Sequence, residues 1–128
     1  MSTIRVDDVG PSAGGTTKSL VRGTASAWVN FNGTGTIAAR DSLNVSSLTD
    51  DGTALYTVNF TNAFSAVDYA IAGFCGNDAA GSDVSTVLTK QYDEAANTTS
   101  AANFAVITTA GQFADVNLVA ASIHGDLA

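Results

Sequence analysis

The chain has 128 residues and a formal net charge of −7, with 5 Lys and Arg against 12 Asp and Glu. So few and dispersed basic residues argue against binding to nucleic-acid phosphates. No apolar run reaches the ~18 residues of a membrane-spanning helix. No basic segment followed by an apolar one opens the chain. We therefore expect no membrane insertion and no standard signal peptide.

The polar part of the composition favours strands over helices. Lys and Glu, which usually cover the wet face of a soluble helix, are limited to Lys18, Lys90 and Glu94. Thr suits a pleated surface, and Asn, Ser, Asp and Gly suit turns. We predict an all-β chain, although its many Ala residues favour helix.

Residues 1–22 are predicted to be an N-terminal attachment arm. Residues 1–9 indicate one exposed strand, 10–17 a loop, and 18–21 a second short extended piece. The apolar residues Ile4, Val6 and Val9 are the candidate partner-binding residues of the arm. Such a strand needs a sheet edge or another subunit to satisfy its backbone hydrogen bonds, and the alternative is a frayed terminus.

Residues 23–128 are predicted to form one antiparallel β-sandwich, jelly-roll-like, because short strands alternate with frequent turn signals. Residues 56–60 alternate apolar and polar side chains, and so do residues 42–46. Further apolar runs span 25–31, 67–74, 84–88, 104–107 and 116–123. Turn signals include Asn32-Gly33 and Asp51-Gly52.

Few residues suggest catalysis, and we expect no enzyme and no cofactor. His124 is the sole imidazole, and Asp126 follows two residues later, but no Gly-x-Ser-x-Gly elbow accompanies them. Cys75 has no basic neighbour in sequence, which favours a buried small hydrophobe over a reactive thiol. With one Cys and one His, a structural zinc site and an internal disulfide are not expected.

Two further motifs are weak candidates for ligand binding. Residues 32–36 are glycine-rich but lack the lysine of a phosphate-binding loop, which favours a turn. Asp50 and Asp51 lack the alternating ligands of an EF-hand. These two residues indicate a turn with solvated carboxylates. A weak calcium site that also includes Asp41 is the alternative interpretation.

The aromatic residues suggest a core, a subunit interface or a sugar-stacking platform. Trp28 is the best candidate for an interface or ligand contact, because a single Trp buries much area and carries one N–H donor. The other candidates are Phe31, Tyr56, Phe60, Phe64, Tyr69 and Phe74.

Several segments resemble a known family. Residues 1–7, MSTIRVD, resemble the opening of many tail-fibre and virion structural proteins of marine bacteriophages. The segment AWVNFNGTGT at 27–36, with 39–50 and 56–60, resembles a small β module that recurs in those proteins. The resemblance covers the arm and residues 25–75 well, residues 76–113 loosely, and 123–126 as a closing strand.

The resemblance implies a non-enzymatic bacteriophage virion protein, located in the virion. The first expectation is a short tail-fibre protein that forms a homotrimer and attaches through its arm to another virion protein of the tail. The first alternative is a capsid decoration (cement) protein. The second alternative is a receptor module that binds a host surface glycan. The single module departs from longer fibres, which carry stalks and extra domains.

Overall fold

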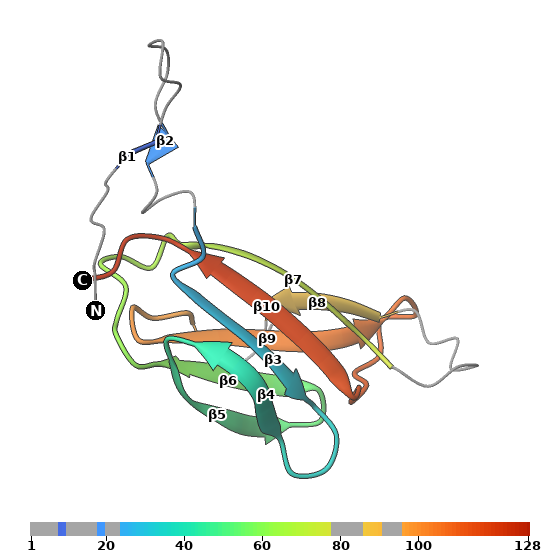
Figure 1. The fold of residues 1–128 in the computed structure, drawn as a ribbon. Coiled ribbons are helices and arrows are strands. Elements are labelled where there is room, and N and C mark those ends of the chain that lie inside the picture. The colour runs from blue at the N-terminus through green and yellow to red at the C-terminus, as the bar shows by residue number, and fades with distance from the viewer. Residues whose placement is uncertain (1–7, 10–17, 20–23, 78–85, 91–95) are drawn as a thin grey trace.

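Two antiparallel sheets make up the body of the protein. The computed structural model describes residues 8–9, 18–19, 24–77, 86–90 and 96–128. Its four-stranded sheets pack against each other, one with strand order β4-β3-β10-β7 and the other with β5-β6-β9-β8 (Figure 1). This confirms the predicted all-β antiparallel sandwich.

Most strands of the two sheets overlap the predicted apolar runs, and β4 and β5 are the exceptions. The first sheet contains β3 (Ala27–Asn32), β4 (Ala38–Leu43), β7 (Ala70–Gly76) and β10 (Leu118–His124). The second sheet contains β5 (Val45–Gly52), β6 (Leu55–Phe60), β8 (Thr86–Lys90) and β9 (Ala101–Thr108). The pairs β3-β4, β5-β6 and β8-β9 are hairpins within a sheet, and the other connections pass between the sheets. Across the described ranges, no helix is long and apolar enough to cross a membrane.

The core lies between the inner faces of the two sheets. Alternate residues of β3, β6 and β10 are buried, because successive side chains on a strand point to opposite faces. Phe31 from the first sheet meets Tyr56 from the second edge to face, with ring centroids 5.1 Å apart. Phe64 and Tyr69 pack on Phe60 at one end of this core.

The chain leaves the first sheet at Asn44, where the predicted single strand over residues 42–46 is wrong. Asn44 has φ 56°, a left-handed conformation that Asn adopts more readily than most residues. Its side-chain oxygen accepts the backbone N–H of Asn62 at 2.7 Å, and its amide donates to the Asn62 carbonyl at 3.1 Å. This corner separates β4 from β5 and sends Val45 to the other sheet.

The three acidic residues considered for calcium all lie on strands, so the turn predicted at Asp50 and Asp51 is wrong. Asp41 belongs to β4, and Asp50 and Asp51 belong to β5. The turn comes just after them, where Gly52 has φ 143° and Ala54 has φ 61°. Asp51 falls where the β5–β6 register shifts.

Within the arm, β1 (Asp8–Val9) pairs antiparallel with β2 (Lys18–Ser19). Over the residues described, these two strands form a sheet of their own and do not extend either large sheet. The arm candidates Ile4 and Val6 lie outside the described residues, as does the predicted loop 10–17. Val9 is described only as a strand position opposite Lys18.

The start of β3 and the C-terminal tail lie at the same end of the sandwich, which we call the arm end. Ser26 donates its backbone N–H to the Ile123 carbonyl at 2.9 Å and its hydroxyl to the Gly125 carbonyl at 2.5 Å. The N–H of Ala128 donates to the Ala63 carbonyl at 2.9 Å. The connection 33–37 lies at the opposite end of β3, so the module has two distinct ends.

Candidate functional site

The outer face of the first sheet carries the candidate site. Strand register sets its side chains in two rows, because directly opposed residues of an antiparallel pair point to the same side. One row is Leu43, Trp28, Ser122 and Ala72, and the next is Asp41, Asn30, Ala120 and Phe74. We call these eight residues the outer face.

Small residues hollow the middle of the outer face. Ala120, Ser122 and Ala72 form the floor of a shallow groove of about 470 Å³, which Trp28 and Phe74 line from β3 and β7. Phe74 is 60% exposed and Leu43 is 49% exposed, whereas Trp28 is half-buried. The groove offers aromatic surface and little polar surface.

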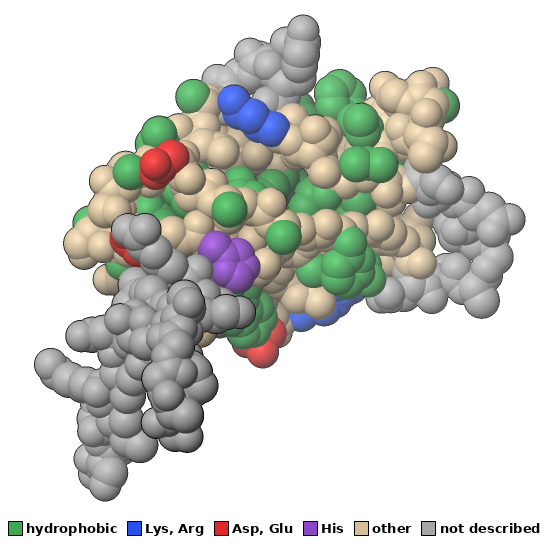
Figure 2. Space-filling view, turned by 90° about the horizontal axis from the view of Figure 1, so that it is seen from above, with side chains coloured by type: hydrophobic (Ala, Val, Ile, Leu, Met, Phe, Trp, Pro, Cys, Tyr) green, Lys and Arg blue, Asp and Glu red, His purple; other side chains and the backbone are tan. Residues whose placement is uncertain are grey.

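Charged side chains lie at the margins of the outer face. Arg40 donates to the side-chain oxygen of Asn30 at 3.1 Å and to the Asn117 carbonyl at 2.6 Å. Asp41 accepts the backbone N–H of Ser42 at 2.8 Å. Figure 2 shows the single imidazole, in purple, among patches of hydrophobic side chains, with red and blue side chains toward the margins. The central surface is therefore uncharged.

The edge strand β7 is exposed along most of its length. Ala70 to Phe74 are all exposed, and Ile71 is 37% exposed although it faces the inner side opposite Ile123. Gly73 leaves no room for a side chain, because a Cβ there would lie 2.6 Å from Leu88 Cδ2. Residues from both faces of β7 are thus exposed between Ala70 and Phe74, although Leu88 covers the inner side of Gly73.

Beneath this sheet, Tyr56 and Asp115 make a structural contact that the sequence analysis did not anticipate. The Tyr56 hydroxyl lies 2.8 Å from the Gly33 carbonyl and 3.0 Å from Asp115 Oδ1. Asp115 Oδ1 also accepts the Ala54 backbone N–H at 2.6 Å. Burial raises the pKa of Tyr56 well above its usual range, and the nearby Asp115 carboxylate raises this pKa further. The contact joins the connection 33–37 to the β5–β6 turn.

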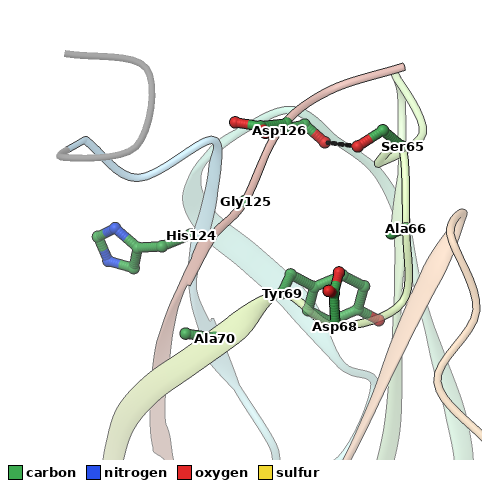
Figure 3. A pocket seen from close by; sticks show the side chains of 8 residues that line it. All are labelled: Ser65, Ala66, Asp68, Tyr69, Ala70, His124, Gly125 and Asp126. Atoms are coloured by element: carbon green, nitrogen blue, oxygen red, sulfur yellow. Dashed lines mark hydrogen bonds between the residues drawn. The ribbon is translucent and has the colours of Figure 1, made fainter. Parts of the chain in front are cut away.

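His124 ends β10 beside a pocket of about 350 Å³ lined by Ser65, Asp68, Tyr69 and Asp126 (Figure 3). Its Nε2 atom lies 3.3 Å from the Ser122 hydroxyl. Ser65 donates its hydroxyl to the backbone carbonyl of Asp126 at 3.1 Å. Figure 3 shows the imidazole pointing away from Asp68 and Tyr69. The geometry does not bring Ser65, His124 and Asp126 together as a catalytic triad.

Cys75 is half-buried rather than fully buried, and it packs against the core near the end of β7. Its carbonyl accepts the Thr86 hydroxyl at 3.1 Å. This contact brings β8 to the C-terminal end of β7, and the thiol serves as a small apolar side chain.

The carboxylates considered for calcium make separate local contacts. Asp51 accepts the Thr57 hydroxyl at 2.6 Å, and Asp50 accepts the Gly52 backbone N–H at 3.2 Å. Asp41 lies on the other sheet. In the part of the chain that the structure describes, no three His, Cys, Asp or Glu residues gather to hold a metal ion.

The glycine-rich segment 32–36 forms the predicted turn. The side-chain oxygen of Asn32 accepts the backbone N–H of Thr34 at 3.1 Å. Gly35 has φ 65° and stands in open space. Gly33 is required for a different reason, because the Tyr56 hydroxyl occupies the place of a Cβ.

Comparison of the chain with models of known protein families, with curated proteins and with solved structures found no match. The phage resemblance is therefore a prediction from the quoted segments alone.

The sequence analysis selected Trp28 but missed its surroundings. Phe74 was among the aromatic candidates, but only the strand register shows that Phe74 and Leu43 share a face with Trp28. The sequence shows that residues 70–76 are apolar and uncharged, but it does not show that β7 is exposed.

Proposed function

We propose that this chain is a bacteriophage virion structural protein, a short trimeric tail-fibre protein that attaches through its N-terminal arm. The observation that carries the proposal is the outer face, which has Asp41 as its single charged residue and exposes Phe74, Leu43 and part of Trp28. Exposed apolar patches on a soluble module are typical of association surfaces. The segments at 1–7 and 27–36 supply the link to phage fibres.

Three copies would bury their outer faces around a threefold axis. Few ions would need to be desolvated there, because only Asp41 is charged in the two rows. The net charge of −7 resides mainly elsewhere and keeps the assembly soluble. Three arms would then act together, so that weak single contacts with a virion partner become strong.

The oligomeric contact is tested by comparing two variants: Leu43→Asp on the outer face, and Val87→Asp as the control. The two side chains are 49% and 50% exposed, but Val87 lies on the second sheet. We expect light scattering to give a multiple of three chains for the native protein and for Val87→Asp, and no more than two chains for Leu43→Asp. A monomeric native protein would contradict the trimer.

The arm is tested by the double substitution Ile4→Asp and Val6→Asp. We expect the sandwich to keep its unfolding transition while incorporation into particles is lost. Incorporation at the native level would show that attachment uses another surface.

Capsid decoration is the first alternative, since the same trimer could sit on a capsid and stabilise the assembled shell. Quantitative mass spectrometry of purified virions separates the two roles. Hundreds of copies per particle indicate decoration, and a few dozen at most indicate a fibre.

Host-glycan binding is favoured by one observation, the groove between Trp28 and Phe74. Aromatic side chains offer an apolar body to a sugar ring, and Asn30 and Ser122 add polar groups nearby. A glycan array probed with native protein and Trp28→Ala tests this function. Glycan binding by the native protein that is lost in Trp28→Ala supports this function, and an array without signal contradicts it.

A further inference from the structure

We infer that β7 pairs edge to edge with β7 of a second copy of this chain, antiparallel and in a register centred on Gly73. This inference does not rest on the proposed function, because it concerns a strand edge and a twofold contact rather than a phage particle or a threefold one.

The first argument is the free edge of β7. Among the residues that the structure describes, the strand is bonded to β10 on one side and is the last strand of its sheet. Ala70 to Phe74 are all exposed. Strand β8 approaches β7 from Gly73 onward: Leu88 lies against the inner side of Gly73, and the Thr86 hydroxyl donates to the Cys75 carbonyl. The open edge presents backbone donors and acceptors that another strand can use.

The second argument is that β7 alone lacks the protection that the other edge strands carry. Natural sheets discourage edge pairing with charged residues or Pro on the edge strand. The seven residues AIAGFCG contain neither. The other described edge strands of the two sheets each carry charge: Arg40 and Asp41 on β4, Asp50 and Asp51 on β5, and Lys90 on β8.

The third argument is that β7 is complementary to itself. A twofold axis perpendicular to the sheet keeps outer side chains opposite outer side chains. Centred on Gly73, the pairing sets Phe74 opposite Ala72 of the second copy, and Ile71 opposite its Cys75. Each larger side chain therefore faces a smaller one, and all seven residues pair.

The neighbouring registers are worse. One of them sets Phe74 opposite Phe74 of the second copy. The other leaves Cys75 and Gly76 beyond the end of the paired strand. The Gly73-centred register joins two four-stranded sheets into one of eight strands, which lies within the usual range of sheet sizes. It also brings the grooves of the two copies side by side.

The register is tested by Ile71→Cys in the full-length chain. The new thiol would face the native Cys75 of the second copy, at the Cβ separation of about 4.5–5.5 Å typical of opposed residues. Within one chain the two thiols are four strand positions apart, about 13 Å, which no disulfide spans. We expect mild oxidation to give a covalent dimer on non-reducing denaturing electrophoresis.

Two matched controls sharpen the result. Ala70→Cys places an exposed thiol opposite Gly76 of the second copy, so we expect no cross-linked dimer. Adding Ala72→Lys to Ile71→Cys should abolish the cross-link, because a charge then lies on the paired strand. Adding Ala39→Lys, on the exposed opposite edge strand β4, should leave it.

Equal cross-linking of Ile71→Cys and Ala70→Cys, or cross-linking that survives Ala72→Lys, would show random collision and overturn the inference. A folded Ile71→Cys protein that does not cross-link would also overturn it. If Ile71→Cys fails to fold, light scattering of native protein and Ala72→Lys decides. An even number of chains, halved by Ala72→Lys, supports the pairing, and any other result contradicts it.

Discussion

Strands β6 and β7 have similar lengths and opposite environments. In β6, Tyr56, Val58 and Phe60 are buried and alternate with half-buried residues that include Thr57 and Asn59. In β7, the residues from Ala70 to Phe74 are exposed whichever face they point to. The folded core accounts for the apolar residues of β6. It does not account for the exposed apolar residues from Ala70 to Phe74 in β7, which the proposed association with another molecule would bury.

The largest expected effect is that of Phe60→Ala in β6. Phe60 is buried against Phe64 and Tyr69, at centroid distances of 4.8 and 5.9 Å. Its removal should lower the free energy of unfolding by about 3–5 kcal/mol, through lost burial and the cavity left behind. Urea unfolding measures this change, and a loss below about 1 kcal/mol would show that this end of the sandwich is not packed as described.

Gly73→Ala should have the next largest effect. The added Cβ would meet Leu88 Cδ2 at 2.6 Å and come closer still to the Ala120 carbonyl oxygen. We expect a loss of about 1–3 kcal/mol from overpacking, measured by thermal or urea unfolding. Gly76→Ala is the matched control on the same strand, since its Cβ would meet nothing within 4 Å. Equal stability of the two variants would contradict the close approach of β8 to β7.

Tyr56→Phe should cost about 1–2 kcal/mol, because it removes a buried hydroxyl that lies within hydrogen-bond distance of the Gly33 carbonyl and Asp115. Its pH dependence is a second readout. The pKa of Tyr56 is raised in the folded state, whereas an unfolded tyrosine ionises near pH ~10. Stability should therefore fall as pH rises above about 10, because the unfolded chain then releases a proton that the folded chain keeps. Tyr56→Phe should make this fall shallower, and an unchanged slope would contradict the buried hydroxyl.

The smallest expected effect on stability is that of Phe74→Ala. Because Phe74 is 60% exposed, we expect a change below about 1 kcal/mol in urea unfolding. The same substitution should weaken self-association measured by light scattering. A stability loss as large as that of Phe60→Ala would assign Phe74 to the core and remove the contrast between β6 and β7.

The sequence predicted the fold class well, because period-two alternation depends only on neighbouring residues. It placed β3, β6 and β10 nearly correctly. It could not place the corner at Asn44, since the apolar pattern at 42–46 continues across it and only the left-handed backbone breaks the strand. The strand order could not be predicted either, because a pairing such as that of β3 with β10 joins residues that are distant in sequence.

The candidate site was only partly predictable. Trp28 was selected for its size, yet its partners Leu43 and Ser122 depend on register between strands. The contact of Asp115 with Tyr56 joins two segments 59 residues apart and leaves no local signal. The uncharged run at 70–76 was visible in the sequence, but its exposure was not, because an apolar run ordinarily predicts burial.

The most direct test of the account is the mass of the native full-length protein in solution, measured by light scattering over a range of concentrations. Association through the outer face predicts three chains, pairing through β7 predicts two, and both contacts together predict six. In each case the mass exceeds the 12.9 kDa of a single chain. A mass of 12.9 kDa at every concentration would contradict the claim that the outer face and β7 are association surfaces.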